Sequence, residues 1–160
     1  NIVHVGEIVR FFPNAKFILA LRHPYDCVLS CFMQNFMLNH AMANFLDLDD
    51  SSKLYDLTMS LWTKYIKVFK VDHHIIKYED VILNFDKTIK DLLSFLDVSW
   101  SEDVKKFYKT AEKRGIINTP SYNQVSQPIY SNSMYRWKNY EKEFVKSKDL
   151  LDHWVKKFKY

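Results

Sequence analysis

The 160-residue sequence predicts a layered α/β domain, with a parallel sheet flanked by helices. Two observations predict this fold class. Short apolar segments at residues 16–21 and 74–78 have the length of strands, and they alternate with longer segments whose apolar residues recur at helical spacing. The first strand is apolar without alternation, which predicts burial on both faces, as is typical of a parallel sheet. The length fits one domain, and a hydrophobic fraction of 48% argues against disorder.

The first helices follow from apolar spacing and turn residues. A helix over residues 2–12 ends at the Pro-Asn pair that follows it. After the first strand, a helix is expected from Pro24 to about Asn44, because proline suits the first turn and Asp26 suits the positive end of the helix dipole. Ser51 or Ser52 then caps a helix that reaches residue 69.

The second half repeats the pattern of strand and helix. The strand at 74–78 is followed by a helix over 85–96, and a helix near 100–112 is predicted from a serine and a glutamate in capping-box spacing. The final helix is expected over about 140–158.

Residues 114–140 lack any periodicity, and a segment of this length inside a domain is often functional. The segment is polar, and it carries five aromatic residues and the cations Arg114, Arg136 and Lys138. We therefore predict a lid-like loop with cationic contacts; a solvated linker is the alternative.

Composition limits the functions that are possible. The net charge of +4 comes without a dense basic run, which favours an anionic small ligand over nucleic acid. The chain has two glycines, so it contains no glycine-rich phosphate loop. Cys27 and Cys31 lie four positions apart, and this spacing predicts packed thiols in a reducing compartment rather than a zinc site or a disulfide. We find no apolar run of membrane-spanning length, and we expect a cytoplasmic protein without a metal.

The segment Phe17–Ser30 (FILALRHPYDCVLS) carries the clearest candidate site. An arginine at the carboxyl end of a parallel strand points to the crevice where open α/β sheets bind ligands. The following turn starts a helix whose first N–H groups attract anions, and Ser30 lies about two turns further on. Arg22 and Ser30 therefore predict a phosphate or sulfate grip, with a structural salt bridge of Arg22 as the alternative. His23, in the turn itself, is expected to be exposed to solvent, and neither His23 nor His4 is assigned a catalytic role.

Three segments, in order, resemble the sulfotransferases that use 3′-phosphoadenosine 5′-phosphosulfate (PAPS). The first is FFPNAKFILALRHPYDCVLS, which is similar to the 3′-phosphate-binding segment with its Arg-x-Pro-x-Asp motif. The second is IIKYED, similar to the Tyr-Glu-Asp signature at a strand end, and it is followed by a helix ending in Phe-Leu. The third is TPSYNQVSQPIYSNSMYRWKNY, which resembles the C-terminal loop of bacterial, tetratricopeptide-linked members near the tyrosylprotein branch.

The resemblance implies a P-loop-like fold and roles for individual residues. Arg22 and Ser30 would grip the 3′-phosphate, and Tyr78 would lie against the adenine. Arg136 would supply a second cation to the phosphates, and Ser121 and Lys138 are weaker candidates. By the same resemblance, the protein would transfer a sulfuryl group from PAPS to an acceptor that bears a hydroxyl.

The sequence also departs from the family pattern. The strand and loop that bind the 5′-phosphosulfate are absent, and the catalytic residues are unknown and expected upstream of Asn1. We therefore expect a partial domain, 1–160, that holds the 3′-phosphate and adenine half and is inactive alone. The missing strand would leave an exposed sheet edge through which the chain could form a homodimer. A non-catalytic nucleotide-binding or interaction module with the same fold stays open, and a relative of P-loop kinases fits the arginine-serine spacing less well.

Overall fold

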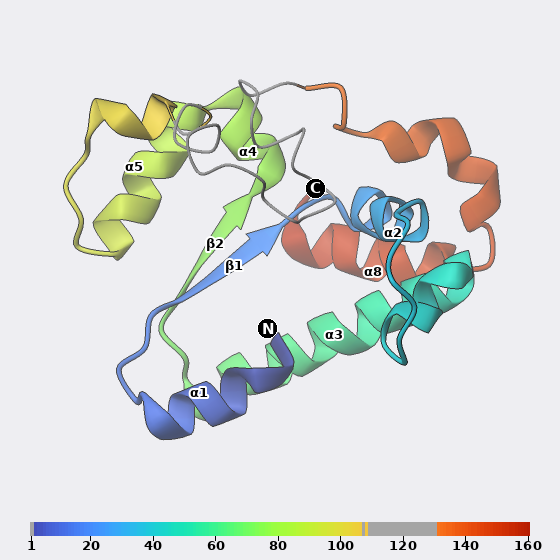
Figure 1. The fold of residues 1–160 in the computed structure, drawn as a ribbon, viewed down its shortest axis with the longest axis horizontal. Coiled ribbons are helices and arrows are strands. Elements are labelled where there is room, and N and C mark those ends of the chain that lie inside the picture. Colours follow the sequence, from blue (N-terminus) through green and yellow to red (C-terminus); the bar gives the residue numbers. More distant parts are fainter. Residues whose placement is uncertain (1, 107, 109–130) are drawn as a thin grey trace.

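The computed structural model describes residues 2–106, 108 and 131–160. Two strands, β1 (Phe17–Leu21) and β2 (His73–Lys77), lie side by side and run parallel, with Phe17 opposite His73 and Leu21 opposite Lys77 (Figure 1). The mixed fold with a small parallel sheet and flanking helices is thus confirmed. The second strand ends one residue earlier than predicted, because Tyr78 already belongs to a helix.

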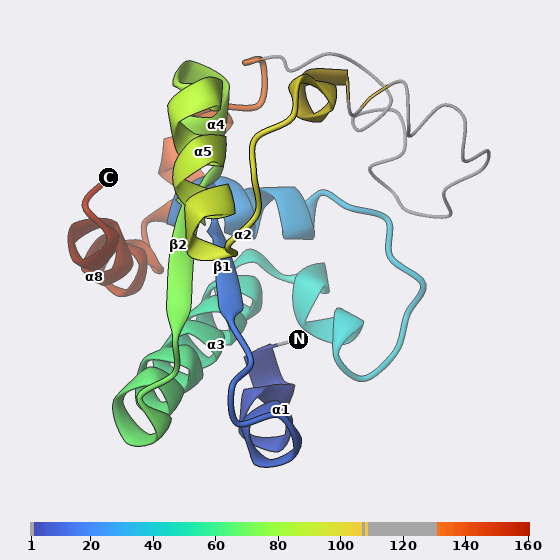
Figure 2. The same ribbon diagram turned by 90° about the vertical axis from the view of Figure 1, so that its left-hand side faces the viewer.

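The core lies on one face of this sheet. Helix α2 (Pro24–Phe32), helix α3 (Leu48–Phe69) and helix α8 (Lys148–Phe158) contact one another there, and Figure 2 shows α3 and α8 beside the two strands. The largest side chains in this core are aromatic or long aliphatic, and Trp62, Leu151 and Trp154 are each at most 3% exposed. Burial of such side chains contributes roughly 1.5–3 kcal/mol each.

The first strand is not buried on both faces, contrary to the prediction. Leu19 and Leu21 are 4% exposed, whereas Ile18, which precedes Leu19 and belongs to the opposite face, is 45% exposed. Within the described part of the chain, no helix contacts β1 on the Ile18 side closely enough to bury it. The edge of β1 opposite β2 also has no strand partner among the described residues. Dimerisation through this edge stays a prediction.

Two helix boundaries in the first half differ from the predictions. Helix α2 ends at Phe32, and the chain continues without a helix to the 3₁₀ helix η2 (Met42–Leu46). The side-chain oxygen of Asn39 accepts hydrogen bonds from the backbone N–H groups of Ala41 and Met42 at the start of η2. Helix α3 begins at Leu48 because Asp47 caps it, accepting from two backbone N–H groups at 2.9 and 3.0 Å. The two serines predicted as caps are buried inside the helix.

The N-terminal segment is helical, as predicted. It forms the short 3₁₀ helix η1 (Ile2–His4) and helix α1 (Val5–Phe11), and both contact α3. Val5 anchors this contact and is 3% exposed.

The C-terminal half contains helix α4 (Tyr78–Leu83), helix α5 (Phe85–Phe95), and two 3₁₀ helices, η3 (Glu102–Lys106) and η4 (Arg136–Phe144). The predicted lid-like loop, 114–140, therefore ends earlier than expected, because its last residues form η4; residues 114–130 lie outside the described residues. The final helix starts at Lys148 rather than near 140, because Tyr140 has non-helical dihedrals and kinks the chain there.

Candidate anion-binding site

Arg22 and Tyr78 are brought together by the strand register. They directly follow the paired residues Leu21 and Lys77, so both leave the sheet at its carboxyl end. The guanidinium carbon of Arg22 lies 5.2 Å from the centroid of the Tyr78 ring. A guanidinium over a phenol ring at this distance is held by cation–π attraction, which is worth roughly 0.5–2 kcal/mol.

The guanidinium is only partly satisfied by the protein. One Nη atom of Arg22 donates to the backbone carbonyl of Ser133, which comes from the segment before η4. Its Nε atom is buried and meets no hydrogen-bond partner in the part of the chain that is described. Arg22 makes no ion pair with the described residues, so the alternative of a structural salt bridge gains no support. An arginine with unused donors is suited to an anion such as phosphate.

The other residues predicted to bind the anion lie on α2, in η4 or outside the described residues. Ser30 lies in the last part of α2, and its side chain is exposed. Arg136 is exposed at the start of η4. Lys138 lies over the ring of Tyr135, with its nitrogen 5.0 Å from the ring centroid. Ser121 lies outside the described residues.

His23 is buried, and the prediction that it is exposed is wrong. It is 5% exposed, and its imidazole stacks on Trp137 at 5.2 Å between ring centroids. Tyr25, Tyr135 and Tyr160 complete the ring of aromatic side chains around it. Trp137 also stacks on Tyr25 at 4.5 Å. The start of η4 is thus fixed against the turn that follows β1.

Burial lowers the pKa of His23 to about 4, and the nearby charge of Lys138 acts in the same direction. In the unfolded chain, the imidazole takes up a proton near its ordinary pKa of 6.5. The unfolded state therefore binds a proton first as the pH falls from 6.5 to 4, and this lowers the free energy of unfolding across that window.

His23→Phe should remove this loss of stability at acidic pH, because the phenyl ring keeps an aromatic contact and does not titrate. We expect chemical denaturation to show a smaller fall in stability between pH 7 and pH 4 for His23→Phe than for the wild type. His153→Phe, at an exposed position of α8, is the matched control and should behave as the wild type. Equal pH dependence of His23→Phe and the wild type would contradict this account.

Two buried carboxylates were not predicted as site residues. Glu79 is 3% exposed, and its Oε1 accepts the backbone N–H of His23 at 2.9 Å. Asp26 is 1% exposed, and its Oδ1 accepts the backbone N–H of Trp137 at 2.8 Å. Burial raises the pKa of Asp26, although the hydrogen bond from Trp137 and the charge of Arg22 act against this. The signal in the sequence was that each acid follows a strand by a few residues and falls in the first turn of a helix.

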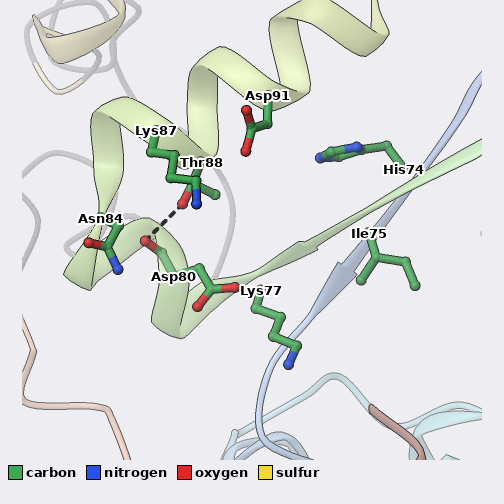
Figure 3. A pocket seen from close by; sticks show the side chains of 8 residues that line it. All are labelled: His74, Ile75, Lys77, Asp80, Asn84, Lys87, Thr88 and Asp91. Atoms are coloured by element: carbon green, nitrogen blue, oxygen red, sulfur yellow. Dashed lines mark hydrogen bonds between the residues drawn. The ribbon is translucent and has the colours of Figure 1, made fainter. Parts of the chain in front are cut away.

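The structure also has pockets away from Arg22. One, of about 240 Å³, lies between β2 and α5 and is lined mainly by polar side chains, including His74, Lys77 and Lys87 (Figure 3). In it, the Thr88 hydroxyl donates to the backbone carbonyl of Asp80 at 3.0 Å. A second pocket, of about 410 Å³, is lined by Tyr25 and Trp137 among others. Neither pocket is lined by Arg22 or Ser30.

Among the described residues, no three His, Cys, Asp or Glu side chains are grouped so that they could hold a metal ion. In the same part of the chain, every helix is too short or too polar to cross a membrane. Cys27 and Cys31 are free thiols, both partly buried.

The chain is similar to a known protein family and to a known protein. Residues 1–102 match the model of a family described as the sulfotransferase family. Over 158 residues, the chain is 29% identical to an uncharacterized protein of Aquifex aeolicus (strain VF5), covering 98% of this chain and 20% of that protein. The chain therefore spans about a fifth of the length of this relative.

Proposed function

Because the chain belongs to the sulfotransferase family, we propose that it forms the part of a PAPS-dependent enzyme that binds the 3′-phosphate and adenine of the co-substrate. The observation that carries the proposal is the placement of Arg22. Its guanidinium lies at the carboxyl end of a parallel strand, is held over Tyr78, and keeps a buried Nε without a partner among the described residues. The carboxyl ends of strands are where open α/β sheets bind ligands.

The remaining predicted residues supplement this grip in the proposal. Ser30 offers an exposed hydroxyl on α2, and Arg136 offers an exposed cation next to Trp137, which packs against the core. Lys138 adds positive charge, and Ser121 keeps its proposed role as a weaker contact. Tyr78 keeps its proposed role against the adenine.

The chemistry requires more than this grip. Sulfuryl transfer resembles phosphoryl transfer, in which an in-line displacement needs cations or donors on the transferred group's oxygens. It also needs a base for the acceptor hydroxyl. The chain has two glycines and no phosphate loop, so in our proposal these groups come from another part of the protein. Residues 1–160 would bind and orient the nucleotide, and the acceptor would be a compound with a hydroxyl group.

Calorimetry on the full protein tests the proposal. We expect 3′-phosphoadenosine 5′-phosphate (PAP) to bind at least about tenfold more tightly than adenosine 5′-phosphate, because one or more charge-assisted bonds to the 3′-phosphate are each worth roughly 1.5–3 kcal/mol. Equal affinity for the two nucleotides would contradict a 3′-phosphate grip. The alternative of a non-catalytic module would show the same preference for PAP, but no sulfuryl transfer from PAPS to any acceptor.

A further inference from the structure

Asp26 connects two parts of the chain that are far apart in sequence. It lies in the first turn of α2, and its buried carboxylate accepts the backbone N–H of Trp137, 111 positions later. The backbone of Tyr135 lies near the same carboxylate and acts to lower the pKa of Asp26 against the effect of burial. A carboxylate that is 1% exposed and accepts from the Trp137 amide fixes the backbone that carries this amide.

The Trp137 amide belongs to the start of η4, and this start has no N-cap side chain of its own. The N-cap position of η4 is Tyr135, which has a left-handed φ of 53° and no side-chain cap hydrogen bond. The first N–H groups of a helix have no partner within the helix and need an acceptor. Asp26 supplies this acceptor from α2, and its negative charge also suits the positive end of a helix.

Arg22 holds the same segment from the other side. Its Nη atom donates to the carbonyl of Ser133, while Asp26 accepts from the amide of Trp137, four residues later. The Oδ2 atom of Asp26 is buried and has no hydrogen-bond partner in the described part of the chain. Burial raises the pKa of Asp26 and the charge of Arg22 opposes this rise, so the two side chains are close enough to interact electrostatically.

We propose that Asp26 is a positioning residue for anion binding. By fixing the amide of Trp137, which lies between Arg136 and Lys138, it sets the direction in which these two cations leave the backbone beside Arg22. This inference rests on the proposed nucleotide function. A merely structural carboxylate would stabilise the domain without changing how Arg136 acts on the ligand.

Hydrogen exchange tests the first step without any nucleotide. In the full protein, Asp26→Ala should speed amide exchange in residues 131–140 by about tenfold or more, because the Trp137 amide loses its acceptor and the start of η4 loses its attachment to α2. Asp26→Asn should restore protection, since its carbonyl oxygen can still accept. The matched control is Asp56→Ala, because Asp56 also accepts from a tryptophan, the indole Nε1 of Trp154 at 2.7 Å, away from Arg22. Unchanged exchange in Asp26→Ala, or the same increase in Asp56→Ala, would overturn the proposal.

Nucleotide binding tests the second step. Asp26→Ala should weaken PAP binding about tenfold, and Asp26→Asn less than threefold. Arg136→Ala should weaken PAP binding in the wild type but have little further effect in Asp26→Ala. In Asp26→Ala, Arg136 is already misplaced by the loss of Asp26, so the two effects are not additive. Additive effects would overturn the positioning role. If the wild type binds no PAP, the proposed function fails, whereas faster exchange specific to Asp26→Ala would still support the fixing of η4 by Asp26.

Discussion

Arg22→Ala should weaken PAP binding by about 10- to 150-fold, the largest loss expected from any single substitution in the site. This range corresponds to the roughly 1.5–3 kcal/mol that a charge-assisted hydrogen bond contributes. Arg22 has the donors for such a bond, because its guanidinium lies over Tyr78 and its Nε is not used by the described residues. Isothermal titration calorimetry of the full protein measures the change directly.

Two further variants show whether the fork geometry of Arg22 matters. Arg22→Lys keeps the charge but loses the planar fork, so it should fall between the wild type and Arg22→Ala. Arg10→Ala removes an exposed arginine of α1 and should bind PAP as the wild type does. Wild-type affinity in Arg22→Ala would exclude Arg22 from the binding site.

Trp154→Ala should lower the domain's free energy of unfolding by about 3–5 kcal/mol, the range for tryptophan-to-alanine changes in protein cores. The indole is 1% exposed, its Nε1 donates to Asp56 on α3, and its ring stacks on Phe158. Its loss would therefore open a cavity between α8 and α3 and leave the carboxylate of Asp56 without this donor.

Chemical denaturation measures this change, with Trp100→Ala as the control. Trp100 is only partly buried, and its Nε1 donates to the exposed Glu102. Trp100→Ala should lower the free energy of unfolding by less than about 1.5 kcal/mol. If the two variants were equally stable, the core contact between α8 and α3 would not be the anchor described here.

The parts of the fold that the sequence predicted correctly depend on local signals. The strand at 17–21 follows from a run of apolar residues, and the start of α2 follows from Pro24, which cannot continue a strand but suits a first helical turn. The place of Arg22 at the end of β1 and of Tyr78 just after β2 follows from these boundaries. Their contact needs only the parallel register.

The parts that failed depend on contacts between distant segments. His23 is polar and lies in a turn, which favours exposure. It is buried because Tyr135, Trp137 and Tyr160 from distant segments, together with the neighbouring Tyr25, surround it. Asp26 was interpreted as a residue favourable to the helix dipole. Its second role, as acceptor for the N–H of Trp137, requires η4 to dock on α2, and no local pattern encodes that docking.

The prediction of the N-cap of α3 was wrong for a different reason, because several neighbouring residues are suited to that position. Asp47, Ser51 and Ser52 are all residue types that are favourable at an N-cap. Asp47 is the N-cap in the structure, and its carboxylate accepts hydrogen bonds from two backbone N–H groups. The hydroxyls of both serines bond back to the carbonyls of Asp47 and Leu48 inside the helix.

The most direct test of the central claim is a crystal structure of the full protein with PAP bound. The account predicts that the 3′-phosphate lies within hydrogen-bonding distance of the Arg22 guanidinium, with Arg136 or Lys138 turned toward it. A 3′-phosphate bound elsewhere, for example between Lys77 and Lys87 in the pocket beside β2, with Arg22 still bonded only to Ser133, would contradict it.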